Sequence, residues 1–280
     1  MIGTLPFVAI MASALLHAAW NALARSHKNP GDIMVTAVMA SGLMSIPLLL
    51  VTGLPPRAAM PWLVGGVVIN SIGIRAAMIA YTRTSYGLAY PIMRAGIPLL
   101  ALPTAILLFN EWPTAGGAVG VLLISLSLIL LAFIASRAGK AELSGVGYAL
   151  LAAVCGAGYV TSDAMGVRLS PLIWSYAGAV SLGNGLVLAL MMRLEGRNPA
   201  KLLAANYARA FFVASLSTSS FFLYVWALNV TPVALAAALR ETSVLFAPAI
   251  AAFVLKEKIT ALHWCAALVA VAGIAAMKLY

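Results

Sequence analysis

Apolar runs long enough to cross a bilayer follow one another along almost the whole chain. A helix needs about 20 mostly apolar residues to cross the hydrocarbon of a membrane. Ten runs approach or exceed this length: 3–24, 33–52, 62–82, 89–109, 116–136, 145–167, 172–192, 209–229, 232–255 and 260–279. The longest polar segment between them, from Arg193 to Tyr207, is too short to fold alone. The pattern therefore predicts an all-α integral membrane protein of ten transmembrane helices.

The ten predicted spans divide into two similar halves. A single offset of 146 residues relates three polar positions: Arg94 to Arg240, Glu111 to Glu257 and Thr114 to Thr260. The polar stretch from Ser136 to Ser144 separates five spans from five, giving one repeat over residues 1–138 and a second over 139–280. Because five is odd, the second copy enters the membrane in the opposite direction, so the halves are predicted to be inverted repeats around a central cavity.

Composition agrees with this interpretation. The chain is 63% hydrophobic and 9% charged, whereas soluble proteins carry roughly 25% charged residues. The net charge of +10 is spread thinly over loops, which favours a membrane surface over nucleic acid as the partner. Cys155 and Cys265 both fall inside apolar runs. We therefore expect no disulfide framework, no metal site and no cofactor.

Basic residues are distributed unequally between the two ends of the predicted bundle. The loops after odd-numbered spans carry eleven: Arg25, Lys28, Arg83, Arg137, Lys140, Arg193, Arg197, Lys201, Arg209, Lys256 and Lys258. The opposite end carries Arg57, Arg168 and Lys278. Since cytoplasmic loops are enriched in lysine and arginine, this count places both termini outside the cytoplasm.

Three arginines, Arg75, Arg94 and Arg240, lie inside predicted spans. Each costs on the order of 3 kcal/mol at the bilayer centre, so such residues face the bundle interior or a wet cavity. They can bind an anionic solute or form internal salt bridges. Arg240 and Glu241 point about 100° apart on a helix, so we expect them to meet different partners. Arg75 is either a site residue or the partner of Glu241. Arg94, whose repeat lacks a matching acid, is predicted to be the freer charge and the first substrate contact.

A second polar set repeats more faintly. His17 and Asn21 in the first span share a helix face with each other, as do Tyr159 and Asp163 in the sixth. His17 and Asn21 are candidate site residues, although a lone histidine is more often a packing residue. Asp163 lies near the end of its span, so it is either a proton carrier or a structural partner, for example of Arg168. Glu241, deeper in its span, is the better proton-coupling candidate.

Aromatic side chains complete the candidate site. Trp20, Tyr90 and Tyr159 are predicted to line the cavity, with Tyr90 four residues before Arg94. Tyr176 and Tyr224, among others, are assigned to the interfacial belt. Glu111 and Thr114, at a short turn between spans, are predicted to cap helices rather than take part in chemistry.

Several segments resemble the EamA branch of the drug/metabolite transporter superfamily. They are His17-Ala18-Ala19-Trp20-Asn21, Leu108-Phe109-Asn110-Glu111, Arg240-Glu241-Thr242-Ser243-Val244-Leu245-Phe246 and Leu255-Lys256-Glu257-Lys258-Ile259-Thr260. The resemblance implies a ten-helix bundle in the cell (inner) membrane that exports amino acids or other small metabolites by alternating access. It also implies that both termini are cytoplasmic, against the basic-residue count.

These observations favour a secondary transporter of small anionic or zwitterionic solutes, acting as a monomer or homodimer. The chain has no nucleotide-binding loop of the GxxxxGK[ST] type. Motifs of membrane enzymes, HExxH and GxSxG, are also absent, so an enzyme is not expected. The alternative is a translocase for a lipid or lipid-linked sugar, or a nucleotide-sugar-like exchanger with the same fold.

Overall fold

A computed structural model of the chain describes residues 2–136, 143–244 and 261–279, and these residues are helical with no strands. Within these described residues, eight helices are long and apolar enough to cross a membrane. They are α1 Thr4–Arg25, α2 Pro30–Thr52, α3 Met60–Arg83, α4 Tyr86–Phe109, α5 Ala115–Ser136, α6 Leu143–Arg168, α7 Ile173–Leu194 and α9 Tyr207–Val230. The first eight predicted spans are therefore confirmed, with boundaries shifted by a few residues.

The last two predicted spans are described only in part. Helix α10 covers Val233–Glu241, and the rest of span 232–255 lies largely outside the described residues. The segment that contains Glu257 and Thr260 lies outside them too. Helix α12 covers Ala261–Leu279, and its apolar segment, Trp264–Lys278, is shorter than the eight spans above.

Local chemistry explains where several helices begin and end. Proline stands in the first turn of α2, where Pro30 removes an N–H that no helical carbonyl could accept. At the other end of α2, Gly53 has φ of 70°, a conformation that a residue with Cβ rarely adopts. Asn110, with φ of 53°, ends α4 in the left-handed region. Helix α4 itself continues through Pro91, Pro98 and Pro103, as membrane helices can when neighbours cover the freed carbonyls.

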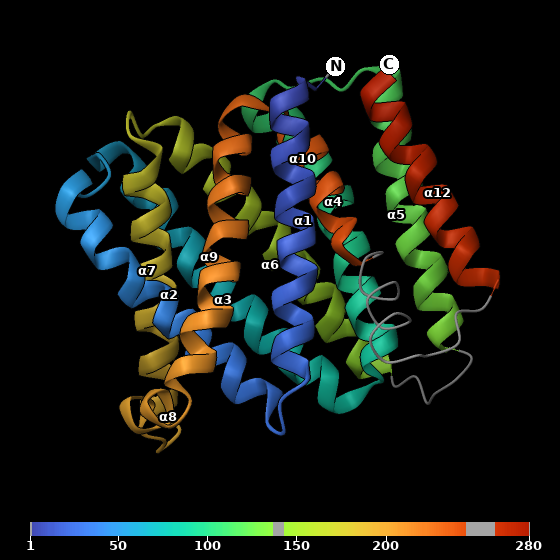
Figure 1. Ribbon diagram of the computed structural model, residues 1–280. Coiled ribbons are helices and arrows are strands. Elements are labelled where there is room, and N and C mark those ends of the chain that lie inside the picture. Colours follow the sequence, from blue (N-terminus) through green and yellow to red (C-terminus); the bar gives the residue numbers. More distant parts are fainter. Residues whose placement is uncertain (1, 137–142, 245–260, 280) are drawn as a thin grey trace.

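Helices of the first half pack mainly on helices of the second half. Helix α1 packs on α9, α2 on α7, α3 on α6, and α5 on α12, while α4 packs on both α5 and α6. Helices α4 and α10 also contact each other, near α1, in the middle of the bundle (Figure 1). Polar bonds join these pairs: Ser13 donates to the Ser220 carbonyl at 2.7 Å, and Asn70 donates to Asn184 at 2.9 Å.

Small residues allow the closest helix contacts. A Cβ placed on Gly120 of α5 would lie 2.7 Å from the carbonyl oxygen of Gly273 on α12. One placed on Gly96 of α4 would lie 2.6 Å from Ala153 Cβ on α6. Small residues at such positions let the backbones of membrane helices approach closely.

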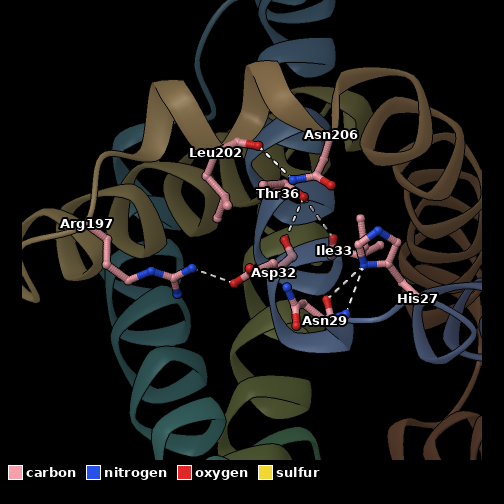
Figure 2. Close-up of polar contacts among 8 residues, drawn as sticks. All are labelled: His27, Asn29, Asp32, Ile33, Thr36, Arg197, Leu202 and Asn206. Carbon is pink, nitrogen blue, oxygen red and sulfur yellow. Dashed lines mark hydrogen bonds and ion pairs between the residues drawn. The ribbon is translucent and has the colours of Figure 1, made fainter.

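Each end of the bundle carries a short element at one of its turns. Helix α8, Pro199–Ala205, follows α7, and Asn198 caps it by accepting from the Lys201 amide at 3.1 Å. Arg197 beside it donates to Asp32 of α2 at 2.5 Å (Figure 2). At the opposite end, where α1 begins and α12 ends, the turn η1 covers Arg57–Ala59.

Candidate functional site

A charged cluster joins α1, α4 and α10 in the middle of the bundle. Nη1 of Arg94 lies 3.1 Å from Oε2 and 3.3 Å from Oε1 of Glu241, and Nη2 lies 2.7 Å from Nε2 of His17. The guanidinium also stacks 5.0 Å from the ring centroid of Tyr90, one helical turn earlier. The side chain of Glu241 is 4% exposed and that of Arg94 is 18% exposed. All four residues are site candidates from the sequence, and the fold brings them together.

Hydrogen-bond chemistry fixes the state of the histidine in this arrangement. A guanidinium only donates, so Nε2 of His17 must accept and the ring proton must sit on Nδ1. Neutral His17 therefore adds an acceptor to Arg94 without adding charge. Trp20 packs edge-on against the His17 ring, with centroids 5.1 Å apart. Asn21 donates to the His17 carbonyl at 2.7 Å, so its amide supports the α1 backbone.

The expectation that Arg94 is the freer positive charge was wrong. Glu241 in the second half supplies its counter-charge from 147 residues away. In the aligned repeats, the residue next to Arg94 is not an acid, and this suggested an unpaired arginine. The carboxylate comes instead from the other repeat, because α10 packs against α4. A buried guanidinium without a carboxylate is costly, and this contact removes that cost.

Arg75 does not join the cluster, and its suggested pairing with Glu241 was also wrong. It pairs instead with Glu195, just beyond α7, at 2.5 Å. The two side chains are 50% and 39% exposed. Arg75 lines a surface groove of about 380 Å³ with apolar residues of α3, α6 and α7. Its place in the structure is therefore on the surface of the bundle.

A second polar cluster lies beside α10 in the second half. The Arg240 guanidinium stacks 4.0 Å from the ring centroid of Tyr224 on α9, and its Nε has no hydrogen-bond partner. Its charge also acts on Asp163 and on Tyr159, both of α6. Arg240 and Glu241 thus meet different partners, as the 100° separation of adjacent helix positions predicts.

Asp163 is fully buried although it lies near the end of its predicted span. Its Oδ1 accepts from the Tyr176 hydroxyl at 3.4 Å, while Oδ2 has no partner. Arg168, the suggested partner, points elsewhere because five residues correspond to a rotation of about 140° on a helix. It pairs with Glu111 at 2.7 Å.

Tyr176 and Tyr224 are the site residues that sequence reasoning missed. Their positions near span ends assigned them to the interfacial belt, but both are completely buried. Tyrosine hydropathy does not distinguish an interfacial ring from one that covers a buried charge. The only available signal was the presence of Asp163 and Arg240, each of which needs a polar or aromatic partner in the membrane.

Glu111 has the structural role that the sequence predicts. Its Oε2 accepts from the Val233 amide at 2.7 Å, which caps the first turn of α10 from 122 residues away. Arg168, its ion-pair partner, also donates to the carbonyls of Leu228 and Thr231 at the end of α9. Thr114 accepts from the Gly117 amide at 3.0 Å and so caps α5.

This architecture defines a multi-pass α-helical membrane protein with charged residues at its centre. Residues 143–279 match the EamA-like transporter family, which is part of the drug/metabolite transporter superfamily. The family consists of membrane transporters of small solutes rather than enzymes.

Two further comparisons concern the whole chain. A solved crystal structure of a protein matches 100% of this chain over 99% of its own length. Its TM-score is 0.75 at 17% sequence identity, so the likeness is one of fold. No curated protein matches the chain.

Proposed function

We propose that this protein is a secondary transporter that exports small zwitterionic or anionic metabolites, amino acids among them, across the cell membrane. The observation that carries the proposal is the buried ion pair between Arg94 and Glu241. It joins the first half of the chain to the second at the centre of the bundle. Ionisable groups in such a position are expensive and mark solute or ion pathways.

The ion pair offers both charges that a zwitterion needs. A solute carboxylate can replace the Glu241 carboxylate on Arg94, because guanidinium binds carboxylates in a two-point geometry. A solute ammonium can then pair with the released Glu241. Each charge in the low-dielectric interior keeps a counter-charge throughout, which avoids the penalty of a lone buried ion. Tyr90, His17 and Trp20 would form the surrounding wall.

Alternating access by two inverted five-helix repeats, 1–138 and 139–280, is part of the proposal. Inverted symmetry would relate the packing of α1 on α9 to that of α6 on α3, and both contacts occur. The contacts of α2 with α7 and of α5 with α12 would each relate to themselves. The repeated arginines each stack on a tyrosine, Arg94 on Tyr90 and Arg240 on Tyr224.

Substitution of Arg94 tests the solute site. Purified wild-type protein is screened against amino acids, organic acids and phosphonates for a compound that raises its melting temperature. At a concentration of a hundred times Kd, binding of the solute should increase the free energy of unfolding by roughly 2.7 kcal/mol. Arg94→Ala should lose this stabilisation and the transport of the same compound in proteoliposomes. Arg75→Ala, which removes a surface arginine, is the matched control and should keep both.

The outcome that would remove Arg94 from the site is wild-type transport by the Arg94→Ala protein.

The lipid translocase is favoured by one observation, the apolar groove along α3, α6 and α7 that contains Arg75. In that case Arg75→Ala should reduce lipid movement between leaflets, and Arg94→Ala should not.

A further inference from the structure

We propose that Asp163 is a proton-binding site, and that its state is transmitted to Arg94 through the adjacent residues Arg240 and Glu241. This inference rests on the proposed transport function and names the ion that is coupled to it. The protons and the solute would occupy separate places, one on each side of the end of α10.

The surroundings of Asp163 favour a proton over a fixed salt bridge. The residue is fully buried, and it takes part in none of the ion pairs among the described residues. Its Oδ1 has a long contact of 3.4 Å to the Tyr176 hydroxyl, the Tyr159 hydroxyl also faces the carboxylate, and its Oδ2 has no partner. An ionised carboxylate left in this way costs several kcal/mol, and binding a proton removes that charge.

The groups that face Asp163 come from several helices. Tyr159 lies one turn earlier on α6, Tyr176 on α7, Tyr224 on α9 and Arg240 on α10. Toward α4, the neighbouring Thr161 bonds to Thr104 at 3.0 Å, and toward α3, Ser162 lies against Gly66. Among these groups Arg240 is the cation, and Tyr224 holds it by its ring face.

Arg240 has the capacity to respond when Asp163 loses its proton. It has a buried Nε donor without a partner, and it makes no ion pair in the part of the chain that the structure describes. An ionised Asp163 would attract this donor, since a charge-assisted hydrogen bond is about twice as strong as a neutral one. The proton leaves to water, and the negative charge that remains is balanced by Arg240.

The covalent link between Arg240 and Glu241 connects the two clusters. Both residues stand in the last turn of α10, where the helix ends at Glu241. A shift of this turn that brings Arg240 to Asp163 also moves Glu241 relative to Arg94. Arg94 then becomes available to a solute carboxylate. Release of a proton from Asp163 therefore favours solute binding, and proton and solute should bind in exchange.

The proton site can be tested directly, because the chain contains only two aspartates, Asp32 and Asp163. Protein labelled with ¹³C-aspartate and reconstituted in lipid vesicles is examined by infrared spectroscopy as the pH is raised from neutral. We expect an isotope-shifted band of a protonated carboxylic acid that disappears with rising pH. Asp32→Asn should keep the band, and Asp163→Asn should lack it.

The Asp32→Asn protein leaves Asp163 as the single labelled aspartate, so the test stands even if Asp163→Asn does not fold. An absent acid band in that protein, or one that persists in Asp163→Asn, would overturn the proposal.

The relay has its own readout in Trp20, which packs against His17. With the other five tryptophans changed to phenylalanine, its emission should shift with pH, and Asp163→Asn should abolish the shift.

An unchanged Trp20 response in Asp163→Asn would overturn the relay. These experiments need no solute, so their failure is distinct from failure of the transport proposal. Loss of solute stabilisation in Arg94→Ala, together with no acid band from Asp163, would leave a transporter that is not coupled to protons at this residue.

Discussion

Single residues show two ways of keeping an arginine inside this protein. Arg94 has a carboxylate and a histidine nitrogen as acceptors, so its charge is compensated by hydrogen bonds. Arg240 has the face of Tyr224, which attracts a cation through the ring quadrupole, and its Nε donor has no partner. Arg94 is thus paired with a carboxylate, whereas Arg240 has one donor, Nε, still available for a new contact.

Removing the carboxylate from the Arg94 pair should destabilise the protein. Glu241→Gln leaves a buried guanidinium without a counter-charge, which costs on the order of 3 kcal/mol. The double variant Arg94→Gln, Glu241→Gln removes both charges and should be more stable than Glu241→Gln alone. Apparent melting temperatures of the purified proteins give this comparison. Additive effects of the two substitutions would show that the pair does not contribute as a unit.

At the scale of elements, α10 is held at both of its ends. Its first turn is capped by Glu111, and its last residue, Glu241, bonds to α4. Between these contacts all of its residues except Arg240 are buried. A helix of nine residues is too short to be stable by itself in water, so these tertiary contacts determine its position.

Loss of the Glu111 carboxylate should loosen this helix. Glu111→Ala removes the cap of the Val233 amide and the ion pair with Arg168, with an expected cost of about 1–2 kcal/mol. Glu195→Ala, which removes an exposed ion pair with Arg75, should cost less than about 1 kcal/mol. Hydrogen exchange of the α10 amides would locate the effect. Equal protection of α10 in Glu111→Ala and wild type would contradict the capping role.

Helix contacts make a second prediction at this scale. Gly120→Ala adds a methyl group where the Gly273 carbonyl and Met277 side chain of α12 already lie, so about 1–3 kcal/mol should be lost. Gly147→Ala is the matched control, because no heavy atom lies within 4 Å of its added Cβ. The control should be neutral or slightly stabilising, since alanine favours helix. A lower melting temperature for Gly147→Ala than for Gly120→Ala would contradict the packing argument.

For the whole molecule, the two ends of the bundle differ in charge. Basic loop residues gather at the end that carries α8, where Arg197 and Lys201 lie, away from the chain termini. The electrostatic preference of lysine and arginine for the cytoplasmic side then sets how the bundle sits in the membrane. The same distribution is opposite to what the family resemblance implies.

Orientation can be measured by labelling cysteines from one side of intact cells. In a protein whose own Cys155 and Cys265 are changed to alanine, Lys201→Cys should be protected from a membrane-impermeant thiol reagent, and Arg57→Cys should react. This result follows from the excess of basic residues at the α8 end. The reverse labelling pattern would mean that both termini are cytoplasmic.

Sequence alone determined the membrane class, the first eight spans and the residues that carry charge into the bilayer. Hydropathy over about 20 residues is a local property, so it can be read directly from the chain. The pattern of His17, Tyr90, Arg94 and Glu241 also identified the main candidate site, because intramembrane polar residues are costly and rarely without a role.

The tertiary structure decided which charges meet. It paired Arg94 with Glu241, Arg75 with Glu195 and Arg168 with Glu111, and it buried Asp163 beside Tyr176. These partners lie far apart in sequence, and their contact depends on the rotation and depth of each helix. Small residues such as Gly120 and close packing set that geometry. Hydropathy does not describe the relative rotation and depth of helices, so only the packed bundle shows which charges pair.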